Sequence, residues 1–231
     1  MTENQPALSR LHYELISGLT HSGACPTNTD LALRFGATTS EIDDLLRALA
    51  DMHGVVLHPH RPAPWIVHPF SITPTINWIE GRGRSWWAPC IWCAFGVATL
   101  VGGEVRLHSR YGAECDPIII PVRDGQPLGF ESVVVHFAIR PARAWDNVHE
   151  HCSMVLPFRS ADEVTRWSTR HNLPRGEAVP LHQVAALANH WYGSHAQPDW
   201  HKWSVAEAQE IFRSAGLTSP FWSLESMEGR F

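Results

Sequence analysis

The chain has 231 residues, of which 44% are hydrophobic and 18% are charged, and its formal net charge is −5 at pH 7. This composition is typical of a globular protein with a sizeable core and excludes a disordered chain. The negative charge argues against a general nucleic-acid binder, which needs a basic surface. Eleven tryptophans indicate a tightly packed core or an apolar, water-poor site.

No targeting or membrane signal stands out. Met1–Ala7 lacks the basic and apolar regions of a signal peptide, and no apolar run reaches the roughly 18 residues of a membrane span. We therefore expect a cytoplasmic protein. Five cysteines are an odd number, and in a reducing compartment they are expected to be buried, metal-binding or reactive thiols rather than disulfides.

The first third of the chain predicts three short helices followed by two strands. Helices are expected over Leu8–Leu19, over Thr27–Phe35 and from Thr39 or Ser40 to Gly54, and strands over Val55–His58 and Trp65–His68. This order is typical of a winged helix-turn-helix. The third helix would face DNA, yet it carries four acidic residues against one arginine, Arg47. Such a helix repels phosphates, so a structural or substrate-covering role is favoured.

The remainder mixes helices and strands. The pattern predicts helices over Ala88–Leu100, from Ser160 to about His171, over Leu181–Tyr192 and from Ser204 to Ala215, and strands over Glu104–Ser109, Ile118–Val122 and Ser132–Ile139. The expected fold class is α+β. A winged-helix-like helical domain over 1–80 would precede an α+β domain over 81–231, with a small, mostly antiparallel sheet and a C-terminal helical extension.

Cys90 and Cys93 form a C-x-x-C pair. No second such pair or H-x-x-x-H completes a zinc site, and the pair does not follow a strand of a βαβ unit as a thioredoxin motif would. Cys90 is therefore interpreted as a buried packing residue.

A second cluster is His149-Glu150-His151-Cys152. If this segment is extended, the two histidines face one side and Cys152 the other. A neighbouring imidazolium would still lower the pKa of the Cys152 thiol and favour the thiolate. The other cysteines are weaker candidates, because two carboxylates flank Cys115 and Cys25 is expected to be structural. The histidines near the C-terminus fit no common metal motif and are interpreted as surface or core residues: His190, His195 and His201.

The segment Trp92-Cys93-Ala94-Phe95 resembles the Trp-Cys-Ala-Leu-Asp motif that opens the active site of organomercurial (alkylmercury) lyases. Cys152 is similar in position to the second catalytic cysteine of that family, since it precedes Phe158-Arg159-Ser160 and a helix with Trp167 and His171. The resemblance covers roughly residues 8–171.

The resemblance implies protonolysis of a carbon–mercury bond. Cys93 and Cys152 would be both the catalytic thiols and the mercury ligands, free thiols would be the acceptors, and no cofactor is implied. Sulfur is the ligand that such a soft metal prefers, and an acid then protonates the carbon.

One departure concerns the acid. The family carries an aspartate three residues after the first cysteine, where this chain has Gly96. Four residues are candidates to replace it by proximity in sequence, Asp146, His149, Glu150 and Glu114, and the glycine is expected to leave room for a larger substrate. The segment Pro180–Phe231 is expected to add a lid or a homodimer contact.

Three other functions stay open. A diverged enzyme of this fold could act on a non-mercury small molecule through Cys93 as nucleophile. A binding protein could sequester Cu(I) or Hg(II) through Cys93 and Cys152, with Cys90 as an additional candidate ligand. A transcriptional regulator is the least favoured.

Overall fold

The structure is a computed structural model that describes residues 5–224; the first four residues of the N-terminal segment and the last seven of the C-terminal extension lie outside the described residues. The helices are α1 (Gln5–Ser22), α2 (Asn28–Phe35), α3 (Thr39–Asp51), α4 (Ile91–Val101), α5 (Val148–Ser153), α6 (Ala161–His171), α7 (Leu181–Tyr192) and α8 (Val205–Ser214), with short 3-10 helices η1 (Tyr111–Ala113), η2 (Pro141–Asp146) and η3 (Pro220–Trp222). None of those within residues 5–224 is both long and apolar enough to cross a bilayer.

The strands form two antiparallel sheets. They are β1 (Val56–Leu57), β2 (Pro64–Val67), β3 (Phe70–Ser71), β4 (Asn77–Gly81), β5 (Arg84–Ala88), β6 (Glu104–Arg110), β7 (Pro117–Arg123), β8 (Gln126–Pro127), β9 (Val134–Phe137), β10 (Val155–Phe158) and β11 (Glu177–Pro180). The larger sheet has the order β1-β2-β3-β5-β4-β6-β7-β8 and the smaller one β10-β9-β11. The predicted α+β class is confirmed. The proposed boundary at residue 80 falls inside β4, and the division into two domains stays a prediction.

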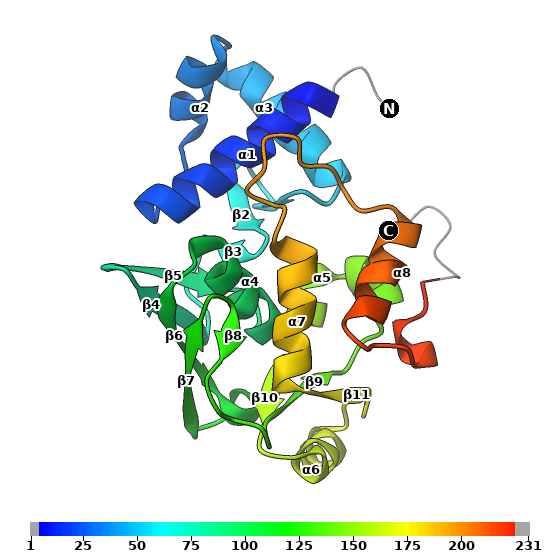
Figure 1. Cartoon of the computed structure of the whole chain (residues 1–231). Helices are drawn as coiled ribbons and strands as arrows, with labels where there is room; N and C mark the ends of the chain where they lie inside the picture. The colour runs from blue at the N-terminus through cyan, green and yellow to red at the C-terminus, as the bar shows by residue number, and fades with distance from the viewer. Residues whose placement is uncertain (1–4, 225–231) are drawn as a thin grey trace.

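Helices α1–α3 gather at one end of the molecule, above the larger sheet (Figure 1). Local signals explain where two of them begin. Thr27 and Thr38 each close a capping box, with Asp30 and Glu41 respectively. The strand β1 follows α3 and pairs with β2, so the elements occur in the expected order. The winged-helix comparison itself stays a prediction.

Helix α4 lies at the centre of the fold. Most of its residues are buried on every side, as expected of a helix that is apolar all round. It packs beside α7 and contacts strands β3–β6 and β10 (Figure 1). The helix ends where Gly102 takes a φ of 63°, a conformation that glycine adopts readily. The first turn of α4 is thereby fixed in the core.

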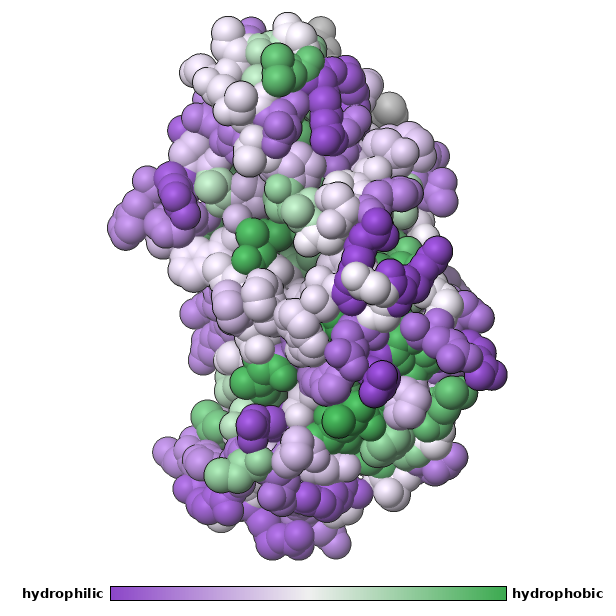
Figure 2. Space-filling view, turned by 90° about the vertical axis from the view of Figure 1, so that its left-hand side faces the viewer, coloured by the Kyte–Doolittle hydropathy of each residue, from purple (hydrophilic) through white to green (hydrophobic). Residues whose placement is uncertain are grey.

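The larger sheet has one buried and one solvent-facing side. Along β7 the buried residues Ile118, Ile120 and Val122 alternate with exposed ones, as the two-residue period of a strand requires. Figure 2 views the molecule from the side on which β4–β7 lie and shows hydrophilic residues over much of the surface, with hydrophobic residues in separate patches. The continuous apolar core therefore lies behind the sheet, around α4 and α7.

The hairpin of β4 and β5 was not expected from the sequence. Its turn residues Arg82 and Gly83 both have positive φ, 55° and 72°, which is typical of a tight two-residue hairpin turn. β5 ends at Ala88, two residues before Cys90 at the start of α4.

Candidate active site

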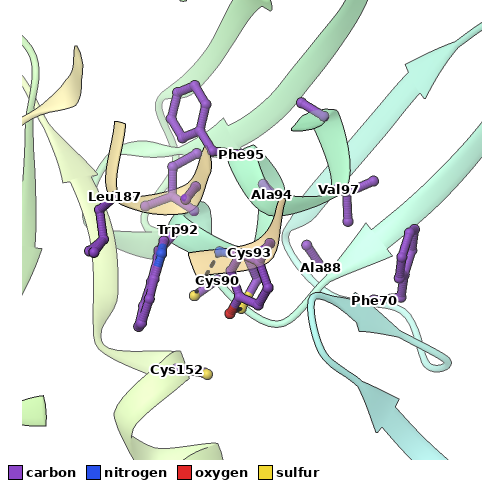
Figure 3. Close-up of a cluster of buried hydrophobic side chains, with 14 of the residues drawn as sticks. Phe70, Ala88, Cys90, Trp92, Cys93, Ala94, Phe95, Val97, Cys152 and Leu187 are labelled. Carbon is purple, nitrogen blue, oxygen red and sulfur yellow. Dashed lines mark hydrogen bonds between the residues drawn. The ribbon is translucent and has the colours of Figure 1, made fainter. Parts of the chain in front are cut away.

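Three cysteines meet in the core. Cys90 and Cys93 come from the start of α4, and Cys152 comes from α5, whose side chain points toward them (Figure 3). All three sulfurs lie within 4.8 Å of one another, and the residues are 0%, 1% and 5% exposed. Two sulfurs that bind one metal at about 2.3 Å each can be at most about 4.6 Å apart, so small movements suffice for a shared soft ion.

Cys90 owes its place in this cluster to helix capping. It is the N-cap of α4, and its Sγ accepts a hydrogen bond of 3.3 Å from the backbone N–H of Cys93 (Figure 3). The expected burial of Cys90 is confirmed, and the structure adds a place beside two other sulfurs that the sequence interpretation did not give it. The C-x-x-C spacing held the missed signal, because residues three apart lie on the same face of a helical turn.

Cys152 is positioned by a short helix rather than by a strand. Asn147 caps α5 by accepting from the backbone N–H of Glu150 at 3.2 Å. The extended alternative for residues 149–152 is thereby corrected. In the helix His151 and Cys152 are both buried, while His149 and Glu150 are exposed. The imidazole buried near the thiols is that of His151.

The three sulfurs differ in their ionisation. Burial opposes ionisation of Cys90, but hydrogen bonds from the thiols of Cys152 and Cys93 and from the Cys93 backbone outweigh it, so the pKa of Cys90 lies well below its usual value. Burial raises the pKa of Cys93. Hydrogen bonding to Cys90 raises that of Cys152. Cys90 is therefore the sulfur of the cluster whose hydrogen bonds most favour the thiolate.

Two further side chains contact Cys93. The Nδ1 atom of His68 lies 3.6 Å from Cys93 Sγ, and the hydroxyl of Tyr192 lies 3.4 Å from it. Burial lowers the pKa of His68 to about 4, and that of His151 is also lowered by burial. Both imidazoles are thus neutral at pH 7. Neither His68 nor Tyr192 carries a local sequence signal, since each comes from an element distant from Cys93 along the chain.

The thiols open onto a cavity of about 90 Å³. Cys93 and Cys152 line it, whereas Cys90 lies behind them. The wall is mainly aromatic and imidazole, and no Asp or Glu of the described residues belongs to it; the lining residues are Met52, His53, His68, Trp92, Cys93, Pro141, Ala144, Trp145, Val148, His151, Cys152, Trp191, Tyr192, His195, Trp200, His201, Lys202, Trp203 and Phe212.

Part of this wall comes from the predicted C-terminal extension. His195 is buried and His201 exposed, as a core and a surface histidine were expected to be, and both also line the cavity. His195 is buried, with a pKa lowered to about 3 by burial and by His68. The connection from α7 to α8 thus forms part of the cavity wall, and the expected lid stays a prediction.

The four candidates for the missing acid lie elsewhere. Asp146 forms an ion pair of 2.9 Å with Arg143 in η2, and His149 is an exposed residue beside Trp65, their rings 5.5 Å apart. Glu150 is exposed. Glu114 pairs with Arg170 and His171 at the surface. The structure brings none of them to the cavity wall, and the catalytic roles given to Asp146 and His149 stay predictions.

Gly96 leaves no empty space. A Cβ atom at this position would lie 2.3 Å from Cδ2 of Tyr192 and 2.9 Å from Cβ of Pro69. The expectation that the glycine gives room to a larger substrate is therefore wrong. The Tyr192 ring fills that room.

Comparisons with known proteins identify the family of the chain. The family model described as alkylmercury lyase matches residues 70–193, more than half of the chain. No curated protein matches. Among solved structures, the mercury-bound form of MerB2 matches with a TM-score of 0.63 and 20% identity, over 87% of this chain and 93% of that one; at this identity the match shows a shared fold. The chain belongs to the alkylmercury lyase family.

Proposed function

We propose that the chain cleaves the carbon–mercury bond of small organomercurials by protonolysis, with Cys93 and Cys152 as the thiols that capture mercury and Cys90 as a third sulfur. One observation carries the proposal: three buried sulfurs lie within 4.8 Å of one another. The described cavity wall carries no carboxylate, and a sulfur-rich, oxygen-poor site favours a thiophilic ion over harder ones.

Capture requires a thiolate, and the hydrogen bonds donated to Cys90 favour it at that sulfur. The organomercurial arrives as a complex with a small thiol and meets Cys93 and Cys152 on the cavity wall. Cys152 passes its proton to the Cys90 thiolate, and the new Cys152 thiolate binds mercury and displaces the small thiolate. The S–Hg bond to the carrier breaks as the S–Hg bond to Cys152 forms. Both neighbouring thiols, Cys90 and Cys93, are then protonated.

Cleavage follows when Cys93 adds to mercury. The Cys93 S–H bond breaks, an S–Hg bond forms, the Hg–C bond breaks, and the carbon gains the proton. The products are a hydrocarbon and Hg(II) held by two thiolates, with Cys90 available as a third ligand once it loses its proton. The step is redox-neutral, so it calls for no electron-transfer cofactor. Free small thiols then remove the Hg(II).

The cavity favours an apolar substrate group. Five tryptophans line it: Trp92, Trp145, Trp191, Trp200 and Trp203. Their apolar surfaces favour a hydrocarbon substituent such as phenyl. We also propose a cytoplasmic location, because all five cysteines are free thiols and the chemistry needs them reduced. A homodimer through the C-terminal extension stays a prediction.

The test is release of benzene from phenylmercury in the presence of excess small thiol, measured by gas chromatography. Exposed Cys115 would bind mercury on its own, so all variants carry Cys115→Ser. We expect benzene to fall to the thiol-only background in Cys93→Ser and Cys152→Ser. Cys25→Ser is the matched control and retains activity. Benzene release that persists without Cys93 or Cys152 would contradict the proposal.

The role of Cys90 is tested separately with inorganic Hg(II). Ultraviolet thiolate-to-mercury charge-transfer absorption distinguishes three sulfur ligands from two. We expect the three-sulfur spectrum in the parent protein and the two-sulfur spectrum in Cys90→Ser. Tight Hg(II) retention without any hydrocarbon release would instead support sequestration, the second candidate function, which the three-sulfur cluster also suits.

A further inference from the structure

Protonolysis at this site raises a question about the path of the proton. In the proposed cleavage, the sulfur that attacks mercury also gives up the proton that the carbon needs. Direct transfer would bend the proton through a strained ring of four atoms: sulfur, hydrogen, carbon and mercury. A bridging hydroxyl expands that ring to six atoms, because it accepts one proton while it donates another.

Tyr192 is the one hydroxyl-bearing residue on the described cavity wall. It stands at the end of α7, is 2% exposed, and its hydroxyl lies 3.4 Å from Cys93 Sγ, where either atom can be the donor. A proton relay requires both roles, because the phenol oxygen must accept a proton from the Cys93 sulfur and donate its own proton to the substrate carbon. The same wall offers no carboxyl group in the part of the chain that the structure describes.

Packing fixes the orientation of the phenol. Its ring occupies the space above Gly96, where a Cβ would lie 2.3 Å from Cδ2 and 2.8 Å from Cε2. The rings of Trp92 and His195 flank it at centroid distances of 5.8 and 5.1 Å. A side chain held on several sides keeps its reactive atom in place without a further entropic cost.

We infer that Tyr192 is a catalytic residue that relays the proton from the Cys93 thiol to the departing carbon. As the Cys93 sulfur binds mercury, its proton passes to the phenol oxygen, and the phenol O–H proton passes to the carbon while the Hg–C bond breaks. Tyr192 ends as it began, a neutral phenol. The inference rests on the proposed function. It assigns to Tyr192 the proton transfer for which Gly96 offers no acidic group. His68, 3.6 Å from Cys93 Sγ, is the rival donor.

The first test is Tyr192→Phe, which keeps the ring and removes only the hydroxyl. Turnover of phenylmercury to benzene should fall about 100-fold, within the range typical of a lost proton-transfer group. The three-sulfur Hg(II) spectrum and the melting temperature should not change, because the ring and the thiols remain. Tyr111→Phe, far from the thiols under the Arg159 guanidinium, is the matched control and should behave as the parent.

The second test exchanges the two partners of the packing contact. Gly96→Asp alone should lose activity, because the new side chain collides with the Tyr192 ring. Tyr192→Ala alone should also lose activity. The double variant Gly96→Asp/Tyr192→Ala should recover turnover above either single variant, because the vacated space admits an acid beside Cys93. The matched control is Gly96→Asn/Tyr192→Ala, which relieves the same collision without an acid; it should stay inactive, whereas equal rescue by asparagine would show a packing effect and count against the relay.

The possible outcomes distinguish the Tyr192 relay from the lyase function on which it rests. If the parent is active and Tyr192→Phe turns over phenylmercury within twofold of the parent, the relay is overturned and the lyase proposal stands. A 100-fold loss of turnover in His68→Asn but not in Tyr192→Phe has the same meaning. A parent that releases no benzene overturns both. A large loss in Tyr192→Phe with unchanged mercury binding, together with rescue in the double variant, establishes the relay.

Discussion

The thiol cavity and the β6–β7 hairpin both carry cysteine, in opposite surroundings. Around the cavity, three buried sulfurs share space with imidazoles and tryptophans, and no carboxylate of the described residues lines the wall. On the hairpin, Cys115 is exposed in the connection between the strands, with Glu114 and Asp116 on either side. The first region offers sulfur and aromatic surface, whereas the second is exposed to solvent and flanked by carboxylates.

The difference shows what makes a thiol useful for soft-metal chemistry. Against the opposing effect of burial, two other thiols and a backbone N–H donate to Cys90 and lower its pKa, and no carboxylate of the described residues lines the cavity. Cys115 has neither the company of other sulfurs nor protection from solvent. Its neighbours are charged groups that pair with one another, as Glu114 does with Arg170. Burial and sulfur neighbours, rather than cysteine itself, define the site.

The strongest test of this contrast places the same substitution in both regions. Cys152→Asp would bury a carboxylate among thiols and aromatic rings, and an uncompensated buried charge typically costs about 3–5 kcal/mol. Cys115→Asp adds a solvated charge and should stay within about 0.5 kcal/mol of the parent. Urea unfolding at pH 7 measures both. Equal effects would mean that the cavity tolerates charge as the hairpin does, and the comparison would fail.

A second test uses acid on the cavity wall. Burial lowers the pKa of His195 to about 3, so between about pH 6.5 and 3 the unfolded chain takes up a proton that the folded chain does not. The free energy of unfolding is therefore not reduced by protonation of His195 above about pH 6.5, and it decreases as the pH falls below that value. At about pH 5 the loss is about 2 kcal/mol.

This acid effect is measured as the difference in unfolding free energy between pH 7 and 5. His195→Gln should reduce that difference, because glutamine does not titrate. An undiminished difference in His195→Gln would show that this part of the wall is wetter than the structure indicates.

The smallest effect is expected on the solvent-facing side of the hairpin. Glu104 and Arg123 pair across β6 and β7 at 2.6 Å, with both side chains more than half exposed. Arg123→Ala should cost at most about 1 kcal/mol, and added salt should reduce the difference further. A larger, salt-insensitive loss in thermal unfolding would place this pair in a more protected setting than its exposure implies.

Much of the fold was predictable from local signals. The bounds of α7 are those expected, Ser204 closes its capping box at the start of α8, and Ser160 caps α6. Such signals act within a few residues and need no tertiary information. The hairpin of β4 and β5 was missed because its residues carry no simple alternation and its turn, Arg82-Gly83, is not among the strongest turn pairs.

The candidate site was predictable only in part. The motif around Cys93 and the position of Cys152 pointed to two sulfurs that do lie together. The helical state of α5 separates the two histidines expected on one side and buries His151 with Cys152, because Asn147 caps a turn that the sequence also allowed to be extended. Tyr192 lies 99 residues beyond Cys93, and no local pattern announces such a contact; only the packing of α7 against α4 creates it.

The contact between Gly96 and the Tyr192 ring also constrains how the family can diversify. A side chain at position 96 would overlap the Tyr192 ring. An acidic residue at 96 and an aromatic residue at 192 are therefore sterically incompatible. A lineage could trade one proton donor for the other only through an intermediate with small residues at both positions, and hence with neither donor. Related sequences should accordingly fall into two groups with opposite residue pairs, and a sequence with bulk at both sites would require a displaced α7.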